Sequence, residues 1–171
     1  MRCSIAFAGV CVLFAVVAFA APANDSKAPA AFQQLKSLAG NWEGTAEFGE
    51  QKMPTKASFR VISNGSALML TTPEGEGDDM ITMFHPDGQA VLVTHYCGSG
   101  NQPRMKLAPS ADPKRFAFEF LDITNVSSSD HGQMRSVIIT ILAPDHHIQE
   151  WHSFDHDKET VARFDMHRVK S

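Results

Sequence analysis

The sequence predicts an all-β fold, an antiparallel up-and-down β-barrel of about ten strands that follows a short N-terminal helix. The first observation is the pattern after Gly40, where short segments rich in Val, Ile, Thr and Phe alternate with Gly, Pro, Asn and Asp. The second is that no helical pattern separates these segments, so the strands form a meander. A meander of this length leaves two sheet edges exposed unless it closes into a barrel. A sandwich of two sheets is the alternative.

The helix and the strands follow from hydrophobic spacing. A short amphipathic helix is predicted over residues 31–38, because Phe32, Leu35 and Leu38 recur at helical spacing. Strands are predicted over residues 41–48, 56–62, 67–72, 79–84, 90–96, 104–108, 115–121, 133–142, 147–154 and 160–169. Turn-forming residues lie at positions 64–65, 73–77, 86–88, 112–113 and 157–158. One strand carries three phenylalanines on a single face, and these are predicted to point into the barrel: Phe116, Phe118 and Phe120.

The N-terminus has the pattern of a secretory signal peptide over residues 1–20. Arg2 supplies a positive charge, an apolar run follows, and Ala18-Phe19-Ala20 provides small residues for cleavage. An uncleaved membrane helix is the alternative, but the apolar run is short for a span. Residues 21–30 are predicted to be a flexible linker and residues 31–171 the barrel domain. We therefore expect an exported protein, periplasmic or secreted, with no transmembrane segment after signal removal.

Cysteine content and net charge argue against a disulfide-stabilised protein and against a nucleic-acid-binding protein. The chain has three cysteines, and only Cys97 would remain after cleavage, so no intramolecular disulfide is expected. The formal net charge is −4, with no basic stripe to contact phosphates. Nucleic acid is therefore not an expected partner. The oligomeric state is left open.

The start of the barrel resembles a known family. The stretch Leu38-Ala39-Gly40-Asn41-Trp42-Glu43-Gly44 resembles the opening of the lipocalins and the wider calycin group. The resemblance implies that Trp42 plugs one barrel end and that a basic residue of the last strand, Arg168, covers it. The fuller pattern is similar to lipocalin-like domains of unknown function in exported bacterial proteins and, more distantly, to nitrobindin-type haem barrels. The chain departs from lipocalins proper, which usually have eight strands and a disulfide.

The first candidate site is the polar turn within residues 94–105. His95 and Cys97 share one face of their strand, and Tyr96 lies on the other. Asn101, Gln102 and Arg104 follow and add hydrogen-bond donors, so a barrel mouth here would suit a carboxylate, a phosphate or a polar ring. The candidate ligand-binding residues are His95, Tyr96, Cys97, Asn101, Gln102 and Arg104. A tight turn held by its own side-chain hydrogen bonds is the alternative. Catalysis by His95 and Cys97 is disfavoured because no third member is recognisable, so a half-buried structural thiol is expected.

The second candidate site is the final hairpin. A two-residue turn at Asp157-Lys158 would pair His152 with Arg163 and Glu150 with Asp165 on one charged face. Trp151, Phe164 and Met166 would occupy the opposite face. One interpretation puts the charged face in solvent. The other turns it inward, so that Glu150, His152 and Arg163 line a cavity and hold a ligand head group.

Eight histidines raise the question of a metal or haem. Only Glu150-x-His152 and His152-x-x-x-His156 have same-face spacing, and no metal site is predicted. Haem needs a single axial histidine in an apolar pocket. The nitrobindin resemblance implies a late-strand histidine, so His152 and His167 are the haem candidates.

The sequence therefore predicts an exported barrel that binds a small-molecule or lipid-like, partly apolar ligand. Three alternatives stay open. The first is an enzyme, an isomerase or a hydrolase, that uses the polar mouth around His95, Tyr96 and Arg104. The second is a haem or metal protein. The third is a scaffold whose barrel is filled by side chains.

Overall fold

The computed structural model describes residues 29–73, 79–126, 132–155 and 158–170. The predicted signal peptide, most of the predicted linker and parts of two predicted turns lie outside these ranges. Within the described residues, no helix is long and apolar enough to cross a membrane.

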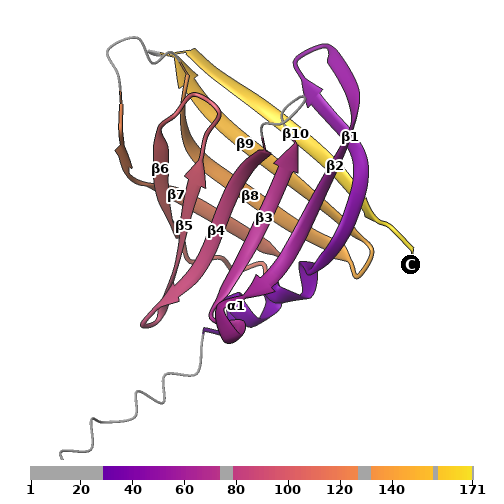
Figure 1. Cartoon of the computed structure of the whole chain (residues 1–171), viewed down its shortest axis with the longest axis vertical. Coiled ribbons are helices and arrows are strands. Elements are labelled where there is room, and N and C mark those ends of the chain that lie inside the picture. The colour runs from indigo at the N-terminus through magenta and orange to yellow at the C-terminus, as the bar shows by residue number, and fades with distance from the viewer. Residues whose placement is uncertain (1–28, 74–78, 127–131, 156–157, 171) are drawn as a thin grey trace, which may run out of the picture.

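Ten antiparallel strands close into a barrel, as the sequence predicts (Figure 1). Each strand pairs with its neighbours along the chain, and β10 returns to pair with β1. The strands are β1 Gly40–Phe48, β2 Gln51–Ile62, β3 Ala67–Pro73, β4 Asp79–Asp87, β5 Ala90–Tyr96, β6 Gln102–Leu107, β7 Arg115–Thr124, β8 Gln133–Ala143, β9 His146–Asp155 and β10 Lys158–Arg168.

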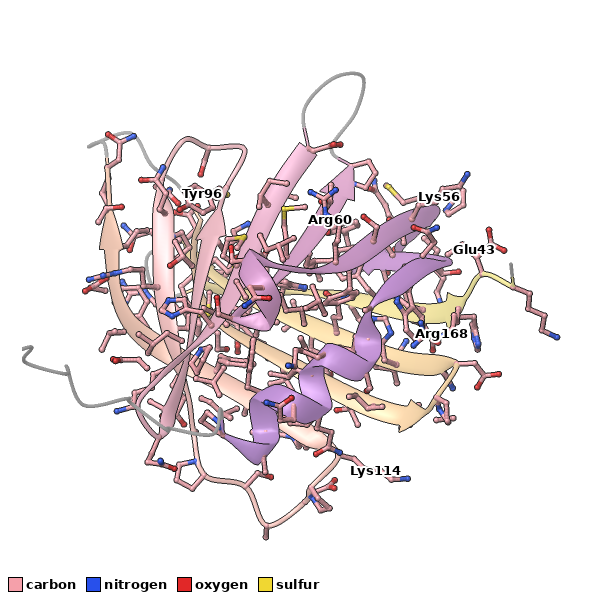
Figure 2. The ribbon with its side chains drawn as sticks, turned by 60° about the horizontal axis from the view of Figure 1, so that its bottom comes forward. Glu43, Lys56, Arg60, Tyr96, Lys114 and Arg168 are labelled. Atoms are coloured by element: carbon pink, nitrogen blue, oxygen red, sulfur yellow. The ribbon has the colours of Figure 1, made fainter. Side chains whose placement is uncertain are left out.

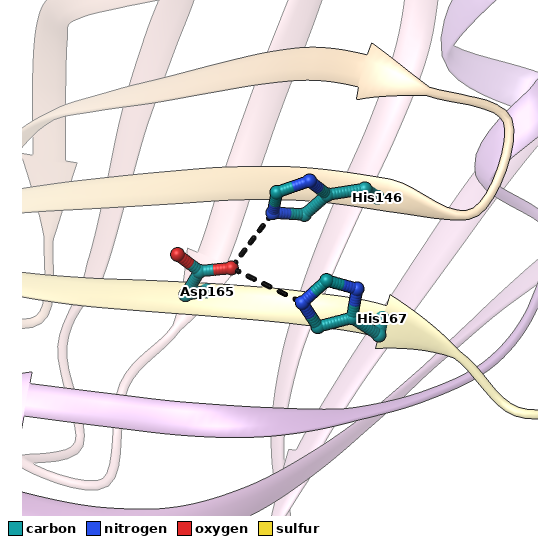
Figure 3. Close-up of side chains that lie close together, drawn as sticks. All are labelled: His146, Asp165 and His167. Atoms are coloured by element: carbon teal, nitrogen blue, oxygen red, sulfur yellow. Dashed lines mark hydrogen bonds and ion pairs between the residues drawn. The ribbon is translucent and has the colours of Figure 1, made fainter.

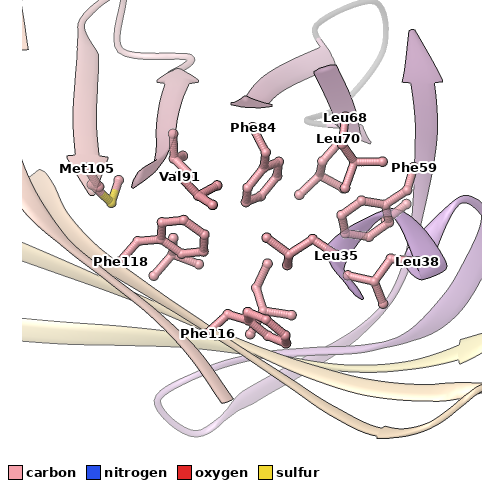
Figure 4. Close-up of a cluster of buried hydrophobic side chains, with 14 of the residues drawn as sticks. Leu35, Leu38, Phe59, Leu68, Leu70, Phe84, Val91, Met105, Phe116 and Phe118 are labelled. Carbon is pink, nitrogen blue, oxygen red and sulfur yellow. The ribbon is translucent and has the colours of Figure 1, made fainter. Parts of the chain in front are cut away.

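A short helical segment covers one end of the barrel, called here the closed end (Figure 1). It consists of α1, Ala30–Leu35, and the 3-10 turn η1, Lys36–Leu38. The apolar stripe that predicts this helix is fully buried, since Phe32, Leu35 and Leu38 are at most 1% exposed. Leu35 and Leu38 project among the barrel side chains in Figure 4. The opposite end, where β1 meets β2 and β5 meets β6, is called the open end.

Trp42 anchors the closed end beneath Arg168. Its indole Nε1 donates a hydrogen bond to the carbonyl oxygen of Leu38 at 2.8 Å. The Arg168 guanidinium carbon lies 4.3 Å from the centroid of the indole ring, and Figure 2 shows Arg168 beside the helical segment. The guanidinium also donates to three backbone carbonyl oxygens, those of Ser37, Ala39 and Pro144. One side chain of the last strand thus joins the plug, the helix and the β8–β9 turn.

The half of the barrel next to the helix is filled by apolar side chains (Figure 4). Phe116 and Phe118 point inward and are buried, as predicted. Their neighbours in the cluster include Phe59, Leu68, Leu70, Phe84, Val91 and Met105. Phe84 and Phe118 meet edge to face, with ring centroids 5.6 Å apart. This end of the barrel is an apolar core of buried side chains.

Gly44 allows β1 to approach β10 closely where the barrel closes. A Cβ atom at this position would lie 1.9 Å from the backbone carbonyl oxygen of Asp165, which is far inside van der Waals contact. The obstacle is backbone, so it cannot turn aside as a side chain would. Glycine in a strand interior often marks such an approach.

Gly44→Ala is expected to lower the free energy of unfolding by about 1–3 kcal/mol, because β1 and β10 must move apart to admit the methyl group. Urea unfolding measures the change. The matched control is Gly49→Asn in the adjoining turn. A Cβ there meets nothing within 4 Å, and asparagine tolerates the positive φ of 59°. Equal stability of the two variants would contradict the argument.

Candidate functional site

The inner face at the open end is apolar and reached by solvent. Phe48 lies on the face of β1 that also carries Trp42 and Ala46, and Met53 of β2 is paired with Ala46. Both point inward, yet Phe48 is 44% and Met53 is 46% exposed. An inward side chain keeps such exposure only where the space before it is open to water. The barrel is therefore filled at one end and accessible at the other.

The opposite wall of the open end continues this surface. Phe120 is paired with buried Met105, so it faces inward, and it is 36% exposed. The guanidinium carbon of Arg135 lies 5.0 Å from the centroid of its ring. Phe164 of β10 is paired with Ala46 and contacts Phe48 edge to face, with centroids 5.9 Å apart. Aromatic side chains from β1, β7 and β10 thus line this end.

His95 is a buried polar group on the inner face of β5. It is 3% exposed, and its Nδ1 lies 2.8 Å from the hydroxyl oxygen of Thr82 on β4. Its ring lies 5.0 Å from that of Trp151 on β9, across the barrel. Burial lowers the pKa of His95 to about 4, so the ring is neutral at pH 7. In the described part of the chain its Nε2 has no hydrogen-bond partner. An unpaired buried polar atom is rare and calls for an explanation.

A line of polar side chains runs down the inner face of β9 from Trp151 to the closed end. Trp151 Nε1 donates to Gln149 Oε1 at 3.0 Å, and Gln149 Nε2 lies 3.0 Å from His147 Nε2. The His147 ring meets Trp42 edge to face at 4.2 Å. Burial, aided by nearby His146 and Arg168, lowers the pKa of His147 to about 3. His147 therefore belongs to the packed end and His95 to the open end.

The turn after β5 is held largely by its own hydrogen bonds. Cys97 N–H donates to the Asn101 carbonyl oxygen at 3.1 Å, and Gly100 N–H donates to the Cys97 carbonyl oxygen at 2.9 Å. Gln102 Nε2 donates to the Gly100 carbonyl oxygen at 2.7 Å, and the Thr124 hydroxyl donates to Gln102 Oε1 at 2.9 Å. Asn101 is buried and Cys97 is half-buried. These contacts support the interpretation of a self-stapled turn.

Tyr96 and Arg104 do not join His95. Tyr96 lies on the opposite face of β5 and is 50% exposed; Figure 2 places it far from the helical segment. The Arg104 guanidinium forms a two-pronged ion pair with Asp122 on the outer face, with Nε 2.5 Å from Oδ1. The structure therefore does not assemble the polar mouth of His95, Tyr96 and Arg104 on which the enzyme alternative depends.

The charged face of the final hairpin points outward. Glu150 and His152 alternate with buried Gln149 and Trp151 along β9, and Arg163 is paired with Glu150. Arg163 contacts Asp165 at 3.1 Å, and His152 Nδ1 lies 2.6 Å from a Glu159 oxygen. The interpretation that puts this face in solvent agrees with the structure. Glu150, His152 and Arg163 thus lie on the wall opposite His95.

The predicted register of this hairpin is wrong by two residues. Lys158 already pairs with Asp155, so His152 lies opposite Val161 and not opposite Arg163. A shift of two residues keeps each side chain on its face, because side chains alternate with a period of two. The predicted faces therefore survive while the predicted partners change.

Thr82, His147 and Gln149 are interior polar residues that the sequence argument did not single out. Alternation offers one signal, since His147, Gln149 and Trp151 occupy one face of a strand whose other face is charged. Thr82 carries no such signal, since a threonine is ordinary in a strand.

Two adjoining hollows lie elsewhere, on the outer wall over β1 and β2. They have volumes of about 370 and 580 Å³ and share Glu43, Lys56 and Pro73 in their linings. Glu43 and Lys56 are opposite each other across the β1–β2 ladder and are labelled in Figure 2. These opposite charges offset each other, so this wall has no strong preference for a charged ligand.

Comparisons with known proteins bear on the fold. No protein-family model matches the chain, and no curated protein matches it. Among solved structures it is similar to Rv2717c from M. tuberculosis, at 13% identity and a TM-score of 0.58, covering 84% of this chain and 99% of that one. It is also similar to a DUF3598-family protein of unknown function from Nostoc punctiforme, at 17% identity and a TM-score of 0.54. That match covers 80% of this chain and 49% of the other, about half its length. At these identities the likeness shows the fold alone.

Proposed function

We propose that this barrel binds a small, partly apolar ligand through its open end. The observation that supports this most is the orphaned Nε2 of buried His95 on the inner face, in a barrel whose inner wall at the open end carries apolar side chains that solvent reaches. A ligand whose apolar part covers Phe48, Met53 and Phe120 would remove that surface from water. One polar atom of the ligand would complete the hydrogen bonding of His95.

The polar atom that meets His95 belongs to an uncharged group, such as a hydroxyl or a carbonyl. His95 is neutral at pH 7 because its pKa is about 4, so it supplies no charge to hold a carboxylate. The arginines put forward from the sequence, Arg104 and Arg163, are paired with outer-face carboxylates. Arg135 stands beside Phe120. A carboxylate would therefore be drawn to Arg135 and not to His95.

The proposal includes export and a lipocalin-like origin. Residues 1–20 have the signal-peptide pattern, and the stacking of Arg168 on Trp42 is what the lipocalin resemblance implies for the closed end. N-terminal sequencing of the mature protein from its native host tests export. The account expects a chain that begins at Ala21.

Binding of 1-decanol and of decanoate, followed by tryptophan fluorescence, tests the site, because Trp151 lies beside His95. We expect decanol binding to depend on His95, whereas decanoate binding should not depend on it, because its carboxylate would be drawn to Arg135. His95→Leu removes one hydrogen bond at nearly unchanged volume and is expected to weaken decanol binding about tenfold.

The matched control is His152→Leu, on the outer face of β9. It should leave decanol binding unchanged. Equal affinities for the wild type and His95→Leu would contradict the site. If neither compound binds and native mass spectrometry finds bare polypeptide, the filled-scaffold alternative stands in its place.

Haem is a second candidate ligand, because the unpaired Nε2 of His95 has the chemistry of an axial ligand to haem iron. The late-strand histidines do not fit, since His152 and His167 lie on the outer face and His167 is 63% exposed. The His147 ring is packed against Trp42 and Phe59. His95 would therefore hold the iron, which would supply a site for a diatomic gas or an electron. A Soret band from the natively produced protein, lost in His95→Leu, tests this candidate.

A further inference from the structure

Three side chains with metal-binding atoms meet on the outer face of β9 and β10, near the closed end (Figure 3). His146 Nε2 lies 2.8 Å from Asp165 Oδ1, and His167 Nε2 lies 3.6 Å from the same oxygen. The ligand atoms all lie within 4.8 Å of one another. The side chains are 29%, 32% and 63% exposed in chain order, so an ion in solution can reach them.

The strand register creates this cluster. His146 and His167 are direct partners across the β9–β10 ladder, and opposite residues on one face bring their Cβ atoms about 4.5–5.5 Å apart. Asp165 precedes His167 by two residues, so it shares that face. The imidazole rings stack with centroids 4.3 Å apart. The site depends on backbone pairing in the barrel wall and not on a loop.

We propose that His146, Asp165 and His167 form a binding site for a divalent transition metal ion of the zinc and copper class. Two imidazoles and one carboxylate are a donor set that such ions prefer. With metal–ligand bonds of about 2.0–2.1 Å, the ligand atoms of a tetrahedral zinc site lie about 3.3 Å apart. The separations of 2.8 and 3.6 Å lie on either side of this value. Small side-chain rotations on fixed strands would complete the site.

Arg163 orients the Asp165 carboxylate toward the two imidazoles. Its guanidinium holds Oδ2 of Asp165 at 3.1 Å, which leaves Oδ1 directed at the two imidazoles. Burial raises the pKa of Asp165, but the hydrogen bonds from His146 and Arg163 outweigh it and hold the pKa below its usual value. The carboxylate is therefore ionised at pH 7. Metal-bound carboxylates are commonly oriented by a second hydrogen bond of this kind.

A bound ion would join β10 to β9 next to the plug of the closed end. His167 directly precedes Arg168, whose guanidinium covers Trp42 and bonds the helical segment. An ion that binds the folded chain alone stabilises it in proportion to its concentration. The site would thus stabilise the last strand near the closed end, on the outer face of the barrel wall and away from the proposed ligand at the open end.

Titration of the chelator-treated full chain with Co²⁺ tests the site, because the visible absorption of cobalt reports its coordination, and competition with Zn²⁺ follows. We expect one ion per chain. Separately, His146→Ala and His167→Ala should each weaken binding at least tenfold. Asp165→Asn, which keeps the side-chain shape, should do the same. The control is His85→Ala on β4, whose ring contacts the Pro86 carbonyl oxygen; it should bind as the wild type does.

Far-ultraviolet circular dichroism of each variant without metal shows whether the barrel is intact. Because Asp165→Asn hardly changes the side-chain volume, it should leave the barrel folded. It therefore shows whether the cluster binds the metal even if a histidine variant unfolds. Absence of binding by the wild type at submillimolar Co²⁺ and Zn²⁺ would overturn the proposal. So would binding that survives all three cluster substitutions, or that is lost only in His85→Ala.

Discussion

Replacing Trp42 with alanine is expected to lower the free energy of unfolding by about 3–5 kcal/mol. The indole is 1% exposed and fills the closed end, so its removal leaves a cavity beneath Arg168. The Leu38 carbonyl oxygen also loses its hydrogen bond from Nε1. Urea unfolding followed by far-ultraviolet circular dichroism measures the change.

Trp42→Phe is the milder substitution at this position. It keeps an aromatic ring under Arg168 and removes the indole N–H together with a small part of the buried volume, so we expect a smaller loss of about 1–2 kcal/mol. A loss below about 1 kcal/mol in Trp42→Ala would mean that Trp42 does not plug the barrel. The helical segment would then be held by Phe32, Leu35 and Leu38 alone.

Acid is expected to destabilise the barrel between pH 6.5 and 4.5. Burial lowers the pKa of His95 to about 4 and that of His147 to about 3. An unfolded histidine has a pKa of about 6.5, so in this window the unfolded chain binds protons that the folded chain excludes. Stability is therefore full above pH 6.5 and falls as the pH falls. Two buried imidazoles together give a loss of about 5 kcal/mol by pH 4.5.

Unfolding midpoints in urea at pH 7, 6, 5 and 4.5 measure this dependence. His147→Gln removes one of the two titrating rings and should reduce the slope by about half. A midpoint that stays constant over this range, or an unchanged slope in His147→Gln, would show that the two rings are not buried as neutral groups.

The barrel was predictable because each strand carries its own signal of alternation and flanking turn residues. The ends of the strands were less predictable from the sequence. The prediction starts the second strand at residue 56, whereas β2 starts at Gln51 and includes Pro54. Proline cannot donate to a ladder, but only residues 58–62 of β2 pair with β3. Pro54 therefore lies in a stretch paired on one side, where it is tolerated.

The candidate sites were less predictable, because function depends on which polar residues face inward and on what they meet there. The sequence placed His95 at the barrel mouth, and the structure puts it on the inner face. It could not show that Arg104 has a partner 18 residues away, Asp122, across a ladder containing a bulge. The two-residue error in the final hairpin hid the pairing of His146 with His167. The pairing register between strands decides these contacts, and the residue pattern within a single strand does not reveal that register.

The most direct test of ligand binding at the open end uses the two buried imidazoles as reporters within one molecule. His95 lies at the open end beside Trp151, and His147 lies at the closed end against Trp42. In histidine-labelled protein, NMR spectra of the ring nitrogens during a 1-decanol titration should show Nε2 of His95 shifting to saturation while His147 stays unchanged. Unchanged His95 resonances at the highest decanol concentration, or a shift of His147 alone, would contradict the account.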